Sequence, residues 1–169
     1  SRLTELEKSS LSNRSTKLFT LSSIKNANKA LLRKGKKDDI TKAEKELAAE
    51  YWNEVAGSMP DWQLALNKEI STKELRENHV HAHAVLLQAL GQIGADLLTT
   101  PKSKWKRALK KLKGIDWARS NKDWEGRAMV HGRISKARVN VSLTGNYIKQ
   151  ALEIPLNAAE EAIEKDCQK

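Results

Sequence analysis

Apolar residues recur every three or four positions along most of this chain, which is the spacing of one face of an α-helix. A half-buried strand alternates apolar and polar residues and needs a second strand to pair with, and no long stretch of this chain meets both conditions. The sequence therefore predicts an all-α fold, a compact multi-helix domain with about six to seven helices and little or no sheet. The apolar pattern begins near Thr20, near Thr41, before Ala82, near Trp105, at about Ile134 and after Asn157.

Local start and stop signals bound several of these helices. Thr41 followed by Glu44, and Ser71 followed by Glu74, have the spacing of capping boxes, in which two side chains satisfy the first free N–H groups. The helix after Thr41 should end before Pro60, and the one after Ser71 should break near Asn78. At the end of the first helix, Gly35 lies in a basic run and is expected to adopt the left-handed capping conformation.

The broadest apolar stripe, Ala82 to Leu97, predicts a central core helix. Gly91 and Gly94 within it indicate a close helix–helix contact rather than a phosphate loop. The alternation from Val139 to Leu143 would also fit a strand, but a lone strand is not stable, so a helix is predicted from about Ile134 to Glu153. Residues 115–133 are expected to be irregular, after a stop at Gly114.

Charge is distributed very unevenly along the chain. The net charge is +10, and residues 101–138 alone carry 13 Lys or Arg against three acids. The rest of the chain is balanced, with 18 basic and 18 acidic side chains, and residues 38–100 hold 11 acids against five bases. Because 39% of the residues are hydrophobic, the chain can bury a core, so this segregation belongs to a folded protein.

The predicted helix that starts after Pro101 carries the strongest functional signal. Its apolar residues occupy one narrow arc and basic residues fill the rest, without an acid to form the usual i,i+4 pairs. Phosphate backbones would relieve the repulsion by releasing counterions, so binding of double-stranded DNA is the leading interpretation. An acidic protein partner and simple solubility are the alternatives. The candidate contact residues are Lys102, Lys104, Lys106, Arg107, Lys110, Lys111 and Lys113.

Basic residues continue beyond this helix, at Arg127, Arg133, Lys136 and Arg138. An arginine can donate two parallel hydrogen bonds to a phosphate or to a guanine edge, so these residues are added to the DNA-binding set. The alternative is that some of them pair with Asp116, Asp123 or Glu125 and hold the irregular segment together. For Arg127 both interpretations stay open.

The sequence offers little that would support catalysis. His79 and His83 would share one face of a helix, as two metal ligands must, but neither a suitable glutamate nor a cysteine completes the set. Capping and packing are preferred for both histidines. We find no glycine-rich phosphate loop and no nucleophile elbow. We therefore expect no enzyme activity, no catalytic residue, no metal and no cofactor.

The compartment and the domain boundaries follow from a few further features. Cys167 is the single cysteine, and the longest apolar run, Ala82 to Leu90, is too short to span a bilayer. We expect a cytoplasmic protein without a membrane partner.

Ser1 at the first position indicates a piece of a longer protein. Residues 1–19 are interpreted as an irregular segment left from a preceding domain, and residues 20–169 as the helical domain.

Five stretches along the chain share the pattern of one known family: Leu11–Leu21, His81–Gly91, Trp124–Met129, Gly132–Lys136 and Ile148–Leu156. These stretches resemble the DNA sulfur-modification family DndB, a group defined by an Asp-Gly-Gln-His-Arg motif. That motif does not occur here, so the chain is similar to the C-terminal part of such a protein. The resemblance implies a bacterial regulator that binds promoter DNA and represses the phosphorothioation gene cluster, with other DNA sulfur-modification proteins as further partners.

Two functions are therefore carried forward. The first is a DNA-binding repressor that contacts backbone phosphates through the basic helix. The second is a protein-interaction module that docks its basic face on an acidic partner and turns its acidic half, residues 38–100, toward its own N-terminal domain. The operator sequence and a homo-oligomeric state are left open.

Overall fold

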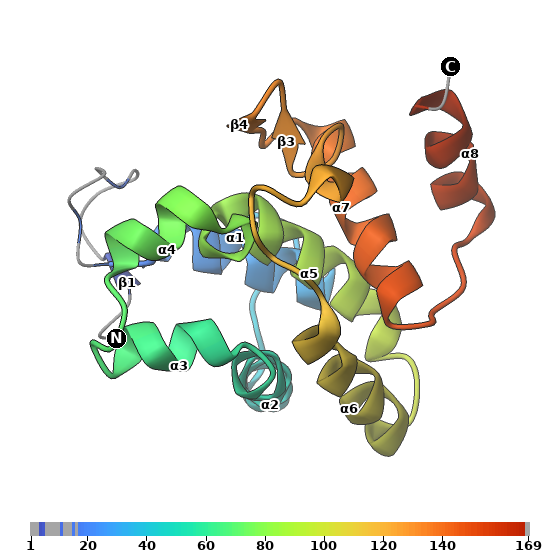
Figure 1. The fold of residues 1–169 in the computed structure, drawn as a ribbon. Coiled ribbons are helices and arrows are strands. Elements are labelled where there is room, and N and C mark those ends of the chain that lie inside the picture. The colour runs from blue at the N-terminus through green and yellow to red at the C-terminus, as the bar shows by residue number, and fades with distance from the viewer. Residues whose placement is uncertain (1–3, 6–10, 12–14, 16, 168–169) are drawn as a thin grey trace.

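A computed structural model describes residues 4–5, 11, 15 and 17–167. These residues form eight α-helices with short 3-10 turns and two tiny two-stranded pairs, which confirms the all-α prediction (Figure 1). The α-helices are α1 Leu21–Leu32, α2 Lys42–Gly57, α3 Pro60–Leu66, α4 Thr72–Asn78, α5 Ala84–Leu97, α6 Lys102–Lys110, α7 Arg138–Ala151 and α8 Ala158–Cys167. The other elements are β1 Thr4–Glu5, β2 Phe19–Thr20, β3 Met129–Val130, β4 Arg133–Ile134 and the 3-10 turns η1 Val80–Ala82, η2 Lys111–Gly114 and η3 Lys122–Trp124.

Helix α5 is the centre of the fold, as its broad apolar stripe predicts. It packs against α1 and against α7, and α8 lies outside α7 (Figure 1). A Cβ atom added at Gly91 would lie 2.5 Å from the carbonyl oxygen of Ala27 in α1, and one at Gly94 would lie 2.5 Å from Leu31 and from the Tyr51 ring. The prediction that both glycines mark a close helix contact is confirmed.

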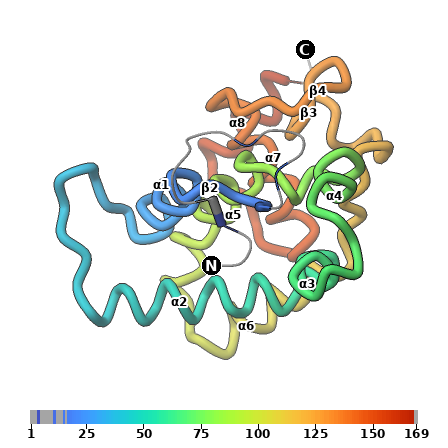
Figure 2. Tube along the Cα trace, turned by 90° about the vertical axis from the view of Figure 1, so that its left-hand side faces the viewer, coloured from blue at the N-terminus to red at the C-terminus, as the bar shows by residue number. Residues whose placement is uncertain are grey.

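Helices α2, α3 and α6 form the other side of the core. Helix α2 runs along one edge of the molecule with α6 beside it (Figure 2). Tyr51 of α2 is fully buried and donates a hydrogen bond of 2.6 Å to the carbonyl oxygen of Leu90. Its ring also faces Trp105 of α6, with 6.1 Å between the ring centroids. Tyr51 thus joins α2, α5 and α6.

The capping signals in the sequence were largely correct. Thr41 and Glu44 form the predicted reciprocal capping box, and the Ser71 side chain accepts from the backbone N–H of Glu74. The left-handed residue after α1 is Arg33, with φ 53°, so the prediction for Gly35 was wrong. The backbone N–H of Gly35 instead donates to the Asp38 carboxylate at 2.7 Å, which places this glycine in the following turn.

One helix and two pairs of short strands were missed in the sequence. Helix α3 begins with Pro60 in its first turn, a position that suits proline because the N–H there needs no partner. Strands β3 and β4 form an antiparallel hairpin in the segment expected to be irregular. Ile134 belongs to β4, so α7 starts at Arg138 rather than at Ile134. Strands β1 and β2 pair in parallel near the start of the chain.

Residues just before α1 are part of the core. Leu18 and Phe19 are buried, and Phe19 packs edge-on against Trp62 of α3 with ring centroids 5.2 Å apart. Arg76 of α4 donates hydrogen bonds to the carbonyl oxygens of Ser15 and Lys17, at 3.3 and 2.7 Å. The last part of the 1–19 segment is therefore bound to α3 and α4.

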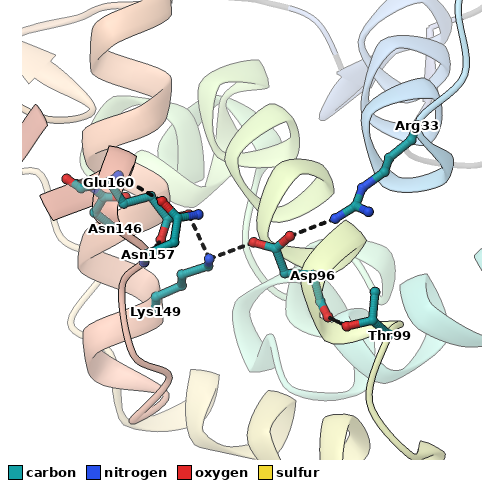
Figure 3. Close-up of polar contacts among 7 residues, drawn as sticks. All are labelled: Arg33, Asp96, Thr99, Asn146, Lys149, Asn157 and Glu160. Carbon is teal, nitrogen blue, oxygen red and sulfur yellow. Dashed lines mark hydrogen bonds and ion pairs between the residues drawn. The ribbon is translucent and has the colours of Figure 1, made fainter. Parts of the chain in front are cut away.

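A buried lysine joins three helices (Figure 3). Lys149 of α7 is 3% exposed and lies 2.7 Å from Asp96 of α5 and 2.6 Å from Glu160 of α8. Arg33, which follows α1, pairs with the other oxygen of Asp96 at 2.8 Å. Burial lowers the pKa of Lys149, but the hydrogen bonds to Asp96 and Glu160 outweigh it, so this pKa lies above its ordinary value.

No helix in the described residues is both long and apolar enough to cross a bilayer.

Candidate nucleic-acid interface

Helix α6 is held in place by its apolar arc. Trp105 and Leu109 are buried, and Leu112 on the following η2 turn is fully buried as well. At 100° per residue, the side of α6 opposite Trp105 carries Arg107, with Lys104 and Lys110 flanking it. The core contacts therefore fix which of the basic residues face solvent.

Two of the predicted contact residues bind α2 instead. Lys102 lies 2.8 Å from Glu50, and Lys106 lies 2.7 Å from Glu50 and 3.4 Å from Glu54. The hydrogen bonds from Lys102 and Lys106 hold the pKa of Glu50 below its ordinary value, and the bond to Glu50 raises the pKa of Lys106. Part of the charge segregation along the chain is thus neutralised inside the fold.

The remaining basic residues between 102 and 113 are of two kinds, one in an ion pair and four exposed. Lys111 of η2 pairs with Glu153, at the end of α7. Lys104, Arg107, Lys110 and Lys113 are exposed, and no ion pair joins them to a carboxylate within the described part of the chain. We call these four residues the α6 outer face.

Arg133, Lys136 and Arg138 are exposed but do not extend this face. They lie on or beside the β3–β4 hairpin, which is at the opposite end of the molecule from α6 in both views (Figures 1 and 2). The structure therefore separates the predicted DNA-binding residues into two groups.

The hairpin itself is built by backbone conformation and by one acid. His131 and Gly132 both have positive φ, 50° and 73°, as a tight two-residue hairpin turn requires. The Glu125 carboxylate accepts hydrogen bonds from the backbone N–H groups of His131 and Gly132.

Arg127 is partly buried, and acceptors from this chain occupy its guanidinium. It donates to both carboxylate oxygens of Glu164 in α8, at 2.8 and 2.9 Å, and to the carbonyl oxygen of Leu143 at 2.7 Å. Its guanidinium also lies over the Tyr147 ring, 5.5 Å from the centroid. The carboxylate that pairs with Arg127 therefore belongs to Glu164. It does not belong to Asp116, Asp123 or Glu125, the three acids that the sequence suggested.

His79 and His83 do not share one face of a helix, so the premise of the metal hypothesis was wrong. His79 and His83 flank the η1 turn in extended conformation, because the chain breaks between α4 and α5. His83 contacts the carbonyl oxygen of Arg76 at 2.9 Å, and His81 contacts the Asp61 carboxylate at 3.0 Å. In the described residues no group of three or more His, Cys, Asp or Glu is arranged to hold a metal ion.

His81 belongs to a column of aromatic rings. Its ring stacks on Trp117 with an interplanar angle of 8°, and Trp117 stacks on Trp124 at 11°. Trp124 meets Tyr147 edge-on, with 4.7 Å between centroids. This column ties the loop 115–128 to α7 and to η1.

The fully buried His81 should make the protein sensitive to acid. Burial lowers its pKa to about 4, which the hydrogen bond to Asp61 only partly offsets, and burial also lowers the pKa of His83. Since an unfolded histidine has a pKa of about 6.5, the unfolded state binds the proton more readily. Stability should therefore fall as the pH drops from about 6.5 toward about 4, by roughly 2 to 3 kcal/mol.

Urea denaturation at pH values between 7.5 and 4.5 measures this loss. His81→Phe keeps the ring stack but removes the titrating group, so it should flatten the dependence. His131→Asn, at an exposed histidine in the hairpin turn, should leave the dependence unchanged. An unfolding free energy that stays constant between pH 7 and pH 5 in the unmodified protein would contradict the prediction.

Fold and charge together define an all-α domain with a cationic helix face at one end and a cationic hairpin at the other. The family model DndB, described as DNA-sulfur modification-associated, matches residues 1–155. The chain therefore belongs to this family, as its sequence indicated. No curated protein and no solved structure matches it.

Proposed function

We propose that this chain is the DNA-binding domain of a bacterial, cytoplasmic repressor of a DNA phosphorothioation gene cluster. In this proposal the α6 outer face contacts backbone phosphates, and the domain has no catalytic activity of its own. The family's association with DNA sulfur modification supports the setting. The carrying observation is that Lys104, Arg107, Lys110 and Lys113 stay exposed without a carboxylate partner in the described residues, although Glu50 and Glu54 neutralise their neighbours.

The geometry of this face suits a polyanion. Trp105 and Leu109 fix the helix against the core, so binding would not have to order a flexible segment. Lysines act as point charges toward phosphate, while Arg107 can fork onto one phosphate with two parallel hydrogen bonds. These contacts carry no sequence information, so the face supplies affinity and register rather than operator choice.

The ion pairs inside the fold lower the expected number of phosphate contacts. Lys102, Lys106 and Lys111 already hold carboxylates, and a phosphate would have to displace them. With about four contacts, log affinity should fall against log salt with a slope of roughly −4.

A triple variant tests the α6 outer face. Replacing Lys104, Arg107 and Lys110 together by glutamine should weaken binding of duplex DNA by roughly 500-fold at about 0.1 M salt and reduce the slope to about −1, on all sequences alike. Fluorescence anisotropy with a labelled duplex at several salt concentrations measures both quantities. The substituted side chains are exposed, so the melting temperature should not change appreciably.

The control removes the same charge elsewhere. Lys42, Lys45 and Lys165 are exposed on α2 and α8, and their triple replacement by glutamine should keep the salt slope. If the α6 variant folds normally and binds DNA with unchanged affinity and slope, the face is not the contact surface. Docking of an acidic protein partner would then be the better account of these residues.

A further inference from the structure

The surface formed by the β3–β4 hairpin and the start of α7 differs in kind from the α6 outer face. Its exposed side chains include Arg133, Lys136, Arg138 and Val139, and we call these four residues the hairpin face. The hairpin lies at the opposite end of the molecule from α6 (Figures 1 and 2). A duplex bound on the α6 outer face would therefore leave the hairpin face uncovered.

The three cations of the hairpin face are not neutralised by the folded chain. Arg133, Lys136 and Arg138 form no ion pair with a carboxylate among residues 4–5, 11, 15 and 17–167. The Glu125 carboxylate lies at the hairpin turn, but it accepts hydrogen bonds from two backbone N–H groups there. Glu125 thus stabilises the turn, and the hairpin face keeps a cationic character.

An apolar side chain lies beside these cations. Val139 is 48% exposed and directly follows Arg138 in the first turn of α7. In the part of the chain that the structure describes, the other exposed large hydrophobic side chain is Leu64 of α3, at 37%. The α6 outer face therefore has no counterpart of Val139. Phosphates would match the cations alone, whereas an acidic protein segment with an apolar side chain matches the cations and the valine.

Hydrogen bonds behind the hairpin face hold its backbone in one conformation. The Ser135 hydroxyl donates to the side-chain oxygen of Asn140 at 2.9 Å, and the Asn140 amide donates to the carbonyl oxygen of Gly126 at 3.3 Å. Arg119 donates to the carbonyl oxygen of Gly132 at 3.0 Å and to a backbone carbonyl oxygen of α4 at 3.4 Å. A partner would meet a preordered backbone, which lowers the entropy cost of binding.

We propose that the hairpin face is the docking site for an acidic protein segment that carries an apolar side chain. Carboxylates of the partner pair with Arg133, Lys136 and Arg138, and its apolar side chain covers Val139. Because the two faces lie at opposite ends, the domain can hold this partner and DNA at the same time. Docking at the hairpin face does not depend on DNA binding at α6.

Two synthetic peptides test this site by isothermal titration calorimetry at about 0.05 M salt, where screening is weak. One is an octapeptide of glutamates with two central leucines, and the other is octaglutamate. The titrations use the full chain with Lys104, Arg107 and Lys110 replaced by glutamine, so that the α6 outer face does not compete for the peptides. The leucine-containing peptide should bind with a dissociation constant below about 1 mM. Octaglutamate should bind about fivefold more weakly, since it leaves Val139 uncovered.

Variants of the hairpin face separate the two contributions. Replacing Arg133, Lys136 and Arg138 together by glutamine should weaken binding of the leucine-containing peptide by about tenfold or more. Val139→Ser should weaken it by about fivefold and remove the difference between the two peptides. These side chains are exposed, so the fold should stay intact, and circular dichroism checks this.

The matched control removes three charges away from the hairpin. Lys37, Lys42 and Lys45 are exposed at and just before the start of α2, and their replacement by glutamine should leave peptide binding unchanged. The proposal is overturned if the leucine-containing peptide does not bind, or if the hairpin substitutions leave its affinity unchanged. Octaglutamate binding as tightly would overturn the assignment of an apolar contact at Val139.

Duplex DNA distinguishes a protein partner from a second phosphate contact. In a chain with an unchanged α6, the three hairpin substitutions should leave the DNA affinity and its salt slope as they are. A fall of the DNA affinity by about tenfold would identify the hairpin face as a DNA contact and overturn the protein partner. Substitutions on α6 that leave DNA binding unchanged would contradict the proposed function only, because peptide binding is measured without that face.

Discussion

Replacing Trp105 by alanine should lower the free energy of unfolding by about 3 to 5 kcal/mol, the usual cost of deleting a large buried aromatic ring. Trp105 is 2% exposed and packs against Tyr51 at the junction of α2 and α6. Helix α6 has only nine residues, and a helix of that length depends on tertiary packing for its stability. The Trp105→Ala substitution should therefore also disorder α6 itself.

Chemical denaturation monitored by far-ultraviolet circular dichroism measures this loss. Ser103→Ala, at an exposed position of the same helix, should change stability by less than about 0.5 kcal/mol. Trp105→Phe should lie between the two, since it keeps an aromatic ring at the site. A Trp105→Ala variant as stable as the Ser103 control would show that α6 is not anchored by this residue.

Gly91→Ala should destabilise the protein by about 3 kcal/mol, at the upper end of the cost of overpacking. The new methyl group would lie 2.5 Å from the carbonyl oxygen of Ala27 and 3.2 Å from its carbonyl carbon. These are backbone atoms of α1, so no side chain can turn away, and α1 and α5 must separate. In an open helix position the same substitution would instead be favourable, because alanine has the higher helix propensity.

Gly57→Ala provides that open position. Gly57 is the last residue of α2, and an added Cβ there meets nothing within 4 Å. Its stability should be unchanged or raised by up to about 1 kcal/mol. Thermal melts of both variants compare the two cases, and equal melting temperatures would contradict the close contact between α1 and α5.

The elements predictable from sequence were those with local signals. The start of α2 was predictable because its capping box joins Thr41 and Glu44, which are only three residues apart. The close contact between α1 and α5 was predictable because Gly91 and Gly94 lie within an apolar stripe. Helix α3 was missed because seven residues hold too short an apolar pattern to stand out, although Pro60 marks its start. The hairpin was missed because its strands have two residues each, which is too short for an alternating pattern to be recognised.

For the candidate interface, the sequence located the basic residues but could not assign their partners. Lys106 is paired with Glu50, which lies more than fifty positions earlier, and Arg127, in the loop before β3, is paired with Glu164 of α8. Such pairs form only when the chain is folded, and no spacing rule predicts them.

The attachment of α8 sets the order in which the domain opens. None of its residues is buried, and it is held mainly by polar links from Lys149 and Arg127 to Glu160 and Glu164. Removing α8 from α7 would expose little apolar surface, while removing α5 would expose the whole core. In hydrogen exchange, the amides of α8 would thus report a local opening at low free energy, well before the global unfolding that releases α5. Its opening would also separate the guanidinium of Arg127 from its carboxylate partner, while Lys149 would keep its ion pair with Asp96 of α5.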